Sequence, residues 1–303
     1  MHACGIEAGR EMTITASLVK ELRERTGAGM MDCKKALVET SGDAEAAAEL
    51  LRKTGQAKAE KKAGRIAAEG KVEIATDGNG RAVIVEINSE TDFVAKDENF
   101  LKFASAVTGA ALATGAATVE ELMAAEHPDG GTLETARAEL VAKIGENIGV
   151  RRLQQMQASG SVGQYSHGSR IGVIVDVVGG DEELRKDIAM HIAAAAPACL
   201  SEADVPAEDL ERERRILTEQ AEGEGKPAEI VAKMVEGRLR KFLGEITLVG
   251  QPFVKDPDLT VGKLLKQKDA SVAAYARIEV GEGIEKKEED FAAEVEAQVK
   301  ASQ

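Results

Sequence analysis

The chain has 303 residues, of which 43% are hydrophobic and 30% charged, a length and composition that suit two or three domains with cores of their own. Its 39 Lys and Arg face 53 Asp and Glu, and the net charge of −14 argues against direct nucleic-acid binding. Its three cysteines, Cys4, Cys33 and Cys199, lack disulfide or metal spacing and suit a reducing compartment. Because no hydrophobic run reaches the length of a membrane span or a signal core, we expect a cytoplasmic protein without a membrane partner.

The first residues, 1–11, carry no hydrophobic periodicity and are interpreted as an extension or an expression remnant. His2 and Cys4 are too few to form a zinc site. Helical spacing then begins, and residues 12–65 are predicted to form a three-helix domain. Its apolar stripes are Leu18, Val19 and Leu22; Cys33, Ala36 and Leu37; and Ala46, Ala47, Leu50 and Leu51. Asp43 should cap the third helix, which is expected to end near Gly55.

Two features of this domain are candidates for surface contacts. Met30 and Met31 follow a Gly-rich turn, so at least one thioether should be exposed at the start of the second helix. The pair is interpreted either as core filler or as an adaptable binding surface. Five basic residues lie close together without aromatic neighbours, which indicates a solvated helix face or a protein contact. They are Lys53, Lys58, Lys61, Lys62 and Arg65.

A change of period at Gly70 indicates β-structure, and a similar string recurs about 90 residues later. Val83, Val85 and Ile87 alternate with other residues in the first copy, and Val173 to Val177 match them in the second. We therefore predict an α+β fold with duplicated β-β-α core subdomains, each sheet covered by a helix. The first subdomain should span 66–158, and the second 159–206 and 247–284.

Between these halves, a helix of about four turns is expected from Leu133 to Ile148, followed by a strand at Arg151 and Arg152. Residues 207–246 read as two charged amphipathic helices, which predicts an inserted antiparallel coiled-coil hairpin. Its expected seam consists of Leu210, Leu217, Val231, Val235, Leu239 and Phe242. Alternation around Ile278 predicts a further strand, and residues 285–303 should close the chain with a helix.

Common catalytic and phosphate-binding motifs are missing from the sequence. The histidines at 2, 127, 167 and 191 are scattered, and His191 is expected to be buried in a helix that covers the second sheet. We therefore expect no enzyme activity, no catalytic residues, no cofactor and no metal. A metabolic enzyme using Asp92 or His167 is the rejected rival, because no base, nucleophile and oxyanion set has a recognisable spacing.

One loop is distinguished by its position between a strand and a helix. It contains Thr91, Asp92, Phe93 and Val94. Phe93 does not fit the hydrophobic stripe of the following helix, and aromatic residues make up only 3% of the chain. Phe93 is interpreted either as an anchor for a partner's pocket or as a residue that packs under its own helix.

Several ordered motifs resemble those of one protein family, elongation factor Ts. They are the stretch from Ala16 to Arg23, Thr26 to Leu37, Thr91 to Lys96, Lys143 to Asn147, His167 to Gly172, Gly250 to Phe253 and Val280 to Glu285. The resemblance covers nearly the whole chain except 1–11. It implies a ubiquitin-associated-like three-helix head, a duplicated core, a coiled-coil hairpin, and guanine nucleotide exchange on the GTPase elongation factor Tu.

The family resemblance also implies which residues bind the partner. Thr91, Asp92, Phe93 and Val94 are expected beside the GTPase's Mg²⁺ site, where they dislodge the ion indirectly and release GDP so that GTP can rebind. Other expected contacts are Met30, Met31, Lys34, Ile144, His167 and Ile246, although His167 has a second interpretation as a residue that closes a turn. A ubiquitin-associated-like adaptor for other proteins is the alternative function, and a dimer of the heterodimer with the GTPase is left open.

Overall fold

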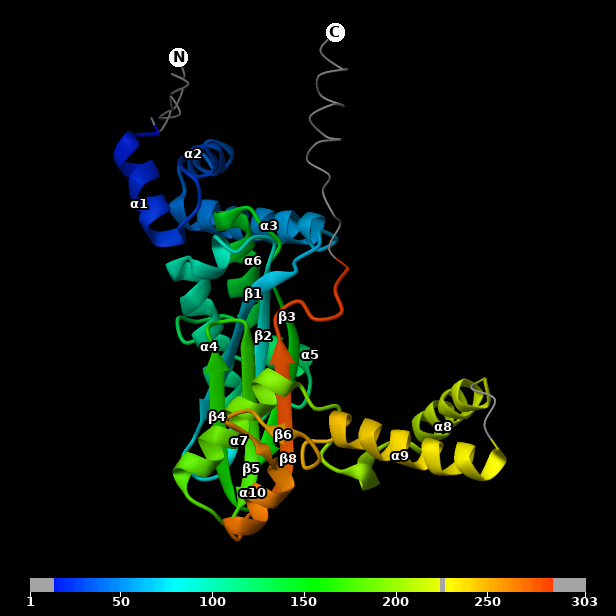
Figure 1. Cartoon of the computed structure of the whole chain (residues 1–303). Helices are drawn as coiled ribbons and strands as arrows, with labels where there is room; N and C mark the ends of the chain where they lie inside the picture. The colour runs from blue at the N-terminus through cyan, green and yellow to red at the C-terminus, as the bar shows by residue number, and fades with distance from the viewer. Residues whose placement is uncertain (1–13, 224–226, 286–303) are drawn as a thin grey trace, which may run out of the picture.

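The computed structural model describes residues 14–223 and 227–285 as an α+β protein with small antiparallel sheets. The first helices of the chain lie at the N-terminal end, the sheets with their helices lie in the middle, and a helical hairpin projects to one side (Figure 1). The expected extension over 1–11 lies outside the described residues, as does the expected C-terminal helix over 285–303 apart from Glu285.

The N-terminal end consists of α1 (Ala16–Thr26), α2 (Met30–Glu39) and α3 (Ala44–Lys62), which we call the head. The Thr15 hydroxyl caps α1, and the Asp43 carboxylate caps α3 by accepting backbone N–H bonds of the first turn. The three helices enclose a small core of their own. It is made of Val19, Leu22, Cys33, Ala36, Leu37 and Ala47.

Helix α3 is longer than the sequence predicted, because it passes through Gly55 and ends at Lys62. Gly55 is buried where α3 packs on α6 (Leu133–Ile144), and a Cβ atom there would lie 3.5 Å from the Ala142 Cβ atom. A glycine inside a helix costs about 1 kcal/mol relative to alanine, and this interhelical contact offsets the cost. The expected end at Gly55 was therefore wrong, and α3 connects the head to the body.

The first sheet has the order β1-β2-β3 and is antiparallel throughout. Its strands are β1 (Glu69–Thr76), β2 (Arg81–Ser89) and β3 (Gly149–Gln157). One face is covered by α4 (Glu98–Thr114), α5 (Val119–Met123) and α6, with Phe100 and Ile87 fully buried between the layers. The expected four turns from Leu133 to Ile148 are shortened, because Gly145 adopts φ +90 and ends α6 at Ile144.

The second sheet has the order β4-β5-β8 and is also antiparallel. Its strands are β4 (Ser161–His167), β5 (Ile171–Val178) and β8 (Ser271–Glu279). It is covered by α7 (Glu182–Ala195) and α10 (Val261–Gln267), which share a core with β5. A small pair, β6 (Pro252–Phe253) and β7 (Asp256–Thr260), precedes α10 and was not predicted.

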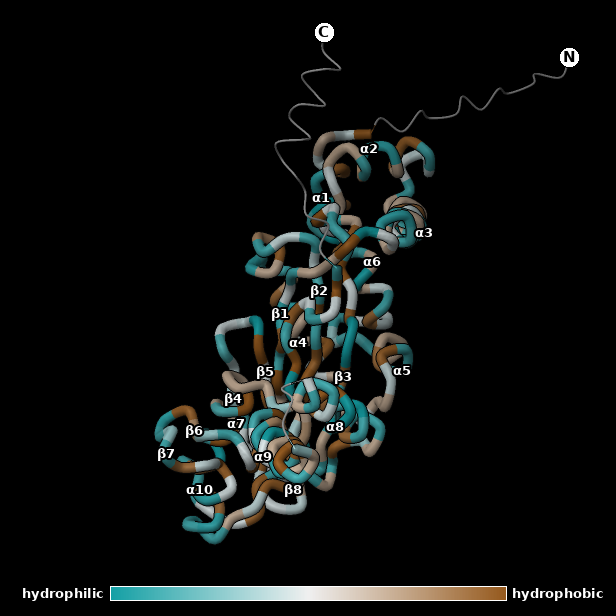
Figure 2. Tube along the Cα trace, turned by 45° about the vertical axis from the view of Figure 1, so that its right-hand side comes forward, coloured by the Kyte–Doolittle hydropathy of each residue, from teal (hydrophilic) through white to brown (hydrophobic). Residues whose placement is uncertain are grey.

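The two sheets pack on one another through the faces that carry no helix. Ile84 of β2 and Ile174 of β5 are fully buried in this interface, and Ile278 joins them from β8. Central strands β2 and β5 are therefore buried on both faces, as the hydrophobic stretches along the middle strands in Figure 2 indicate. Gly172 allows the close approach, because a Cβ atom there would lie 2.6 Å from the Val72 Cγ1 atom.

The projecting hairpin consists of α8 (Ala207–Glu222) and α9 (Ala228–Ile246). Its buried seam is Leu217, Ala221, Val231, Val235, Leu239 and Leu243, while Leu210 and Phe242 from the predicted seam are half-buried. The hairpin projects from the part of the body that contains the second sheet (Figure 1). In the chain it lies between the 3₁₀ turn η2 (Glu202–Asp204) and Thr247. No helix in the described parts of the chain is long and apolar enough to cross a membrane.

Candidate partner-binding surface

The loop that follows β2 has a defined local structure. After Ser89 the chain makes a bend at Glu90–Phe93 and enters the 3₁₀ turn η1 (Val94–Lys96), before Asp97 caps α4. The Ser89 hydroxyl donates to the Thr91 carbonyl at 2.9 Å, and the Val94 N–H donates to the Thr91 hydroxyl at 3.3 Å. These bonds on both sides of Asp92 and Phe93 fix the ends of the segment that carries them. We call residues Thr91–Val94 the exchange loop, after the role that the family resemblance implies for them.

Phe93 is the most exposed large hydrophobic residue among the described parts of the chain, with a relative accessibility of 81%. The interpretation that Phe93 packs under its own helix was therefore wrong. Val94, its neighbour, is buried in the core of the first sheet. Its side chain therefore anchors the exchange loop on the core and is not free to contact a partner. A single aromatic side chain is thus presented to solvent on a supported loop.

Asp92 is exposed beside Phe93, and the Lys96 ammonium donates to its carboxylate at 2.7 Å. This hydrogen bond lowers the pKa of Asp92, so the carboxylate is ionised at neutral pH. An exposed ion pair of this kind has a small effect on stability. Lys96 thus occupies one oxygen of the Asp92 carboxylate, which lies next to the exposed ring of Phe93.

Glu146 holds the exchange loop from the other side, and sequence reasoning assigned it no role of its own. Its two carboxylate oxygens accept the Thr91 backbone N–H at 3.0 Å and the Thr91 hydroxyl at 2.8 Å. Glu146 lies between α6 and β3, 55 positions along the chain from Thr91. The only sequence signal was its place within the Lys143–Asn147 motif, which pointed to Ile144 as a contact and not to Glu146.

The head presents a second surface at the start of α2. Met30 is 53% exposed and Met31 65%, and Lys34 is exposed one turn later. The prediction that at least one thioether is exposed is confirmed. Val38, which is 58% exposed and lies seven positions after Met31, extends the same helix face and was not predicted. Flexible thioethers on an exposed helix face suit a contact that adapts to its partner.

The remaining predicted site residues fall into different places. Ile144 is half-buried against the core of the first sheet, directly before the segment that contains Glu146. His167 is exposed at the end of β4, where its ring stacks on Tyr165 at a centroid distance of 6.4 Å. Ile246 is half-buried at the base of the hairpin, packed against the hairpin seam.

Backbone register places His167 and the exchange loop at the same end of the sheets. Glu69 lies opposite Ser89 in the first sheet, and Arg170 from the turn after His167 pairs with Glu69. The Val72 N–H also donates to the carbonyl of Ser169 in that turn. The turn after β4 and the loop after β2 are therefore neighbours, whereas Ile246 lies apart at the hairpin base.

The basic cluster in α3 is largely used within the chain. Lys58 pairs with Asp32 of α2 at 2.9 Å, and Lys62 donates to the Gly145 carbonyl. Arg65 lies 3.5 Å from the Glu90 carboxylate, just before the exchange loop. The first contact joins two helices within the head, and the other two hold the end of α3 and its linker on the body, which neither of the two sequence interpretations anticipated.

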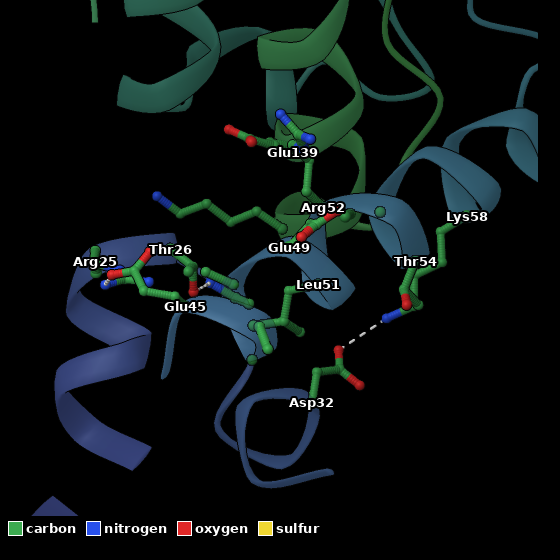
Figure 3. Close-up of a pocket in the computed structure, with 17 residues that line it drawn as sticks. Arg25, Thr26, Asp32, Glu45, Glu49, Leu51, Arg52, Thr54, Lys58 and Glu139 are labelled. Atoms are coloured by element: carbon green, nitrogen blue, oxygen red, sulfur yellow. Dashed lines mark hydrogen bonds and ion pairs between the residues drawn. The ribbon is translucent and has the colours of Figure 1, made fainter. Parts of the chain in front are cut away.

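A groove of about 650 Å³ lies between the head and the body (Figure 3). Its charged side chains largely neutralise one another, since Arg25 pairs with Glu45 at 2.6 Å and Lys58 with Asp32. No group of His, Cys, Asp and Glu in the described part of the chain could hold a metal ion. The groove is therefore read as the space between two packed units and not as a ligand site.

His191 is buried in α7, as expected, and serves the base of the hairpin. The Val254 N–H donates to its Nδ1 atom at 3.3 Å, so its Nε2–H donates to the Gln251 side-chain oxygen at 3.0 Å. Gln251 in turn donates to the carbonyl of Glu245 in α9 at 2.8 Å. Burial lowers the pKa of His191 below its usual value. The neutral ring thus connects α7 with the end of α9.

Comparison with known proteins now adds to this geometry. The family model described as "Elongation factor TS" matches residues 90–282. Elongation factor Ts from Methylococcus capsulatus is 62% identical over 294 residues, which cover 96% of this chain and 100% of that protein. The same name is given to a protein from Thioalkalivibrio sulfidiphilus, also 62% identical over 96% of this chain and 100% of its own length. Elongation factor Ts from Legionella pneumophila is 57% identical over 95% of this chain and 99% of that protein.

These matches define the class of the protein, which is that of the translation elongation factors. Within that class the chain belongs to the elongation factor Ts family. The resemblance stated from the motifs is thereby confirmed over nearly the full length of the chain.

Proposed function

We propose that this protein is a guanine nucleotide exchange factor that binds elongation factor Tu and promotes GDP release, so that GTP can rebind during translation elongation. The observation that carries the proposal is Phe93, an aromatic side chain 81% exposed on a loop held at both ends, in a chain of this family. Aromatic side chains that fill a partner's pocket contribute a large share of binding free energy. The protein acts through this contact and performs no chemistry of its own.

The proposed mechanism displaces the Mg²⁺ ion of the GTPase indirectly. Magnesium demands near-ideal octahedral geometry, so a small shift of the groups around it weakens its binding. Phe93 enters an apolar pocket beside that site, and Asp92 contacts the element that the ring displaces. Neither side chain needs to coordinate the ion, and Asp92 already shares one oxygen with Lys96.

Exchange then follows from linkage between the two ligands of the GTPase. If the factor binds the nucleotide-free GTPase more tightly, nucleotide must weaken the factor by the same coupling free energy. A coupling of about 4 kcal/mol corresponds to roughly a thousandfold change in affinity. The nucleotide pool, and not the factor, sets which nucleotide rebinds.

The remaining predicted contacts form the wider interface in this proposal. Met30, Met31 and Lys34 on α2 dock on a helix of the GTPase, Ile144 and His167 contribute from the body, and Ile246 contributes at the hairpin base. The proposed domain division begins with a ubiquitin-associated-like head over 12–65. The two sheets with their helices are duplicated core subdomains, the first over 66–158 and the second over 159–206 and 247–284. Residues 207–246 form an inserted coiled coil. The proposal includes the association of two such heterodimers into a dimer.

The proposal also covers cofactors, other partners and cellular location. It needs no cofactor, metal, nucleic acid or membrane of its own, because the chemistry of exchange resides in the GTPase. Its place is the cytoplasm, where translation elongation takes place.

The deciding experiment measures release of labelled GDP from purified elongation factor Tu with and without this protein. The expected result is a large acceleration, and no acceleration at saturating protein would overturn the proposal. Chelating Mg²⁺ should accelerate release from the GTPase alone and reduce the advantage of wild type over Phe93→Ala. A Phe93→Ala defect of the same size without Mg²⁺ would contradict ion displacement while leaving exchange itself intact.

A second candidate is an adaptor of the ubiquitin-associated type. It is favoured by the exposed face of α2, where Met30, Met31 and Val38 are available for a contact with other proteins. Affinity capture from a bacterial lysate separates the two functions. An exchange factor recovers one abundant GTPase, whereas an adaptor recovers other partners and does not accelerate GDP release.

A further inference from the structure

The segment from Gly145 to Asn147, which we call the junction, contacts two parts of the proposed interface at once. On one side Glu146 accepts two hydrogen bonds from Thr91 of the exchange loop. On the other side the Asn147 amide donates to the Arg65 carbonyl at 2.8 Å and to the Ala63 carbonyl at 3.3 Å, both in the linker that leaves α3. The junction therefore lies between the head linker and the exchange loop.

Further contacts close this arrangement around Glu90. The Asn147 backbone N–H donates to the Glu90 carboxylate at 2.6 Å, and Arg65 approaches the same carboxylate. Lys62, in the last turn of α3, donates to the Gly145 carbonyl. Gly145 itself needs its φ of +90, which lets the chain leave α6 and turn toward the loop.

The Thr91 hydroxyl passes the constraint from Glu146 to the exposed residues. It donates to a Glu146 oxygen at 2.8 Å and accepts the Val94 N–H at 3.3 Å, so both ends of the Asp92–Phe93 dipeptide are connected to the carboxylate through one side chain. Hydrogen bonds to a charged acceptor are shorter and stronger than those between neutral groups. Neither Asp92 nor Phe93 contacts the core through its own side chain, since both are exposed.

We propose that Glu146 is a positioning residue that fixes the direction of Phe93 through Thr91. This inference rests on the proposed exchange function and adds to it a residue that need not touch the GTPase. Ordering the loop before binding removes the entropy cost of ordering it in the complex. It also places the ring for the displacement step, so loss of Glu146 lowers the maximal rate of GDP release more than the affinity.

The first test measures the loop itself, without any GTPase. The chain contains no tryptophan, so Phe93→Trp introduces a single fluorescent reporter on the exchange loop. Time-resolved anisotropy should show greater local motion of this Trp when Glu146→Gln is added, because the variant replaces a charged acceptor by a neutral amide whose NH₂ group cannot accept the Thr91 hydroxyl proton. Glu139→Gln, at an exposed position of the preceding helix α6, makes the same charge change and should leave the anisotropy unchanged. Equal anisotropy with and without Glu146→Gln would overturn the inference.

The second test measures GDP release over a range of factor concentrations in the Phe93 background. Glu146→Gln should lower the maximal rate about tenfold, the effect of losing one hydrogen bond to a charged group, while the half-saturating concentration stays within about twofold. Thr91→Val should give a similar loss, and the double variant should be no worse than either single one. Full maximal rate in folded Glu146→Gln, or strictly additive losses with Thr91→Val, would contradict positioning through Thr91.

Asn147→Ala supplies a matched contrast within the junction. It removes the two bonds to the head linker but keeps the backbone N–H that binds Glu90. It should therefore raise the half-saturating concentration and preserve the maximal rate, the opposite pattern to Glu146→Gln. If wild type itself fails to accelerate GDP release, the proposed function is overturned, whereas the anisotropy result still decides whether Glu146 holds the loop.

Discussion

The loop after β2 and the loop after β5 connect the same kinds of element, a central strand and the helix that covers its sheet. Both helices begin with an aspartate cap, Asp97 for α4 and Asp181 for α7. The second connection needs only Gly179 and Gly180 before its cap, whereas the first runs from Glu90 through Phe93 and η1. The difference teaches that the exposed aromatic residue is not required by the β-β-α arrangement, because the second sheet forms the same arrangement without it.

The two connections also differ in what limits their sequence. Gly179 and Gly180 both have positive φ, and Cβ atoms there would lie 2.3 Å from the Asp269 carbonyl oxygen and 2.5 Å from the Leu184 Cδ2 atom. The second loop is therefore fixed by close packing. The first is fixed by hydrogen bonds to Glu146 and leaves Phe93 without packing constraints. Changes in the two loops should consequently affect different properties, and the following predictions test this contrast.

The largest expected contrast is between two phenylalanines on either side of η1. Phe100→Ala removes a fully buried side chain from the first core and should lower the free energy of unfolding by about 3 to 5 kcal/mol. Phe93→Ala should leave the unfolding free energy nearly unchanged, yet slow GDP release about 30-fold, as expected for a binding hot spot. Denaturant unfolding and GDP release separate the two effects. A large stability loss in Phe93→Ala would show that the ring packs on its own chain in solution.

The second expected effect concerns the tight loop of the second sheet. Gly179→Ala should lower the free energy of unfolding by at least about 2 kcal/mol, because it combines a positive φ with a backbone clash. Gly78→Ala is the matched control, since it has φ +74 with open space around the added Cβ atom. It should cost about 1 kcal/mol, the price of strain alone. Equal losses in both variants would mean that the close approach near Asp269 relaxes readily.

The third expected effect is a pH dependence confined to the second sheet and the hairpin base. Burial lowers the pKa of His191, so below about pH 6.5 the unfolded chain binds a proton that the folded chain does not. Stability should therefore fall as pH decreases through this window, by at most about 1.4 kcal/mol per pH unit. His191→Gln should flatten this slope in thermal unfolding curves measured between about pH 7 and pH 5. An unchanged slope in the variant would assign the pH dependence to other groups.

The fourth expected effect is smaller and tests whether the exchange loop acts as a unit. Asp92→Ala should slow GDP release about three- to fivefold, less than Phe93→Ala, because Asp92 assists the displacement that the ring begins. The double variant should be less impaired than the product of the two losses, since both side chains act on one displaced element. Lys96→Ala is the companion variant that frees the Asp92 carboxylate without removing it. Multiplicative losses would indicate that Asp92 and Phe93 act independently.

The smallest expected effect comes from removing the hairpin. Replacing Ala207 to Gly244 by a short linker should change GDP release by about twofold or less, because the hairpin has a hydrophobic seam of its own and projects from the body (Figure 1). Circular dichroism and thermal unfolding confirm that the shortened protein is folded. Complete loss of exchange in a folded deletion would move the exchange surface toward α8 and α9.

Much of this fold follows from local patterns in the sequence. The three head helices, the strands around Val83 and Val175, the two hairpin helices and the strand near Ile278 are present where periodicity predicted them. Local pattern failed to predict helix ends that depend on tertiary contacts. Gly55 does not end α3, because it packs on α6, and Gly145 ends α6 earlier than expected. The packing of one sheet on the other was not predicted. The alternation of Val83, Val85 and Ile87 in β2 indicated only the face that the helices cover, whereas Ile84 is buried on the opposite face, against the second sheet.

In the candidate site, too, local features could be predicted from the sequence and long-range contacts could not. The exposure of at least one residue of the methionine pair could be predicted, because the pair follows a Gly-rich turn. For Phe93 the sequence left two interpretations open, and the structure selects the exposed one. Glu146 could not, since its contact with Thr91 joins residues 55 positions apart and a lone glutamate before a strand carries no distinctive pattern. Long-range hydrogen bonds of this kind are set by the assembled fold and leave no periodic signal in the sequence.

The buried carboxylate of Glu86 has a consequence for how the chain is made. It lies in β2, where burial alone would raise its pKa, but hydrogen bonds from Gly281, Asn88 and Arg152 together lower it. The Gly281 N–H that donates to it at 2.8 Å is 195 positions downstream. At a synthesis rate of about 5 to 20 residues per second, roughly 10 to 40 seconds separate the two residues as they leave the ribosome. During that interval β4 and β5 are made, but β8 follows only just before Gly281, so the second sheet and the hydrogen bond to Glu86 are completed near the end of synthesis. Ile84 and its neighbours are therefore fully covered only at that late stage.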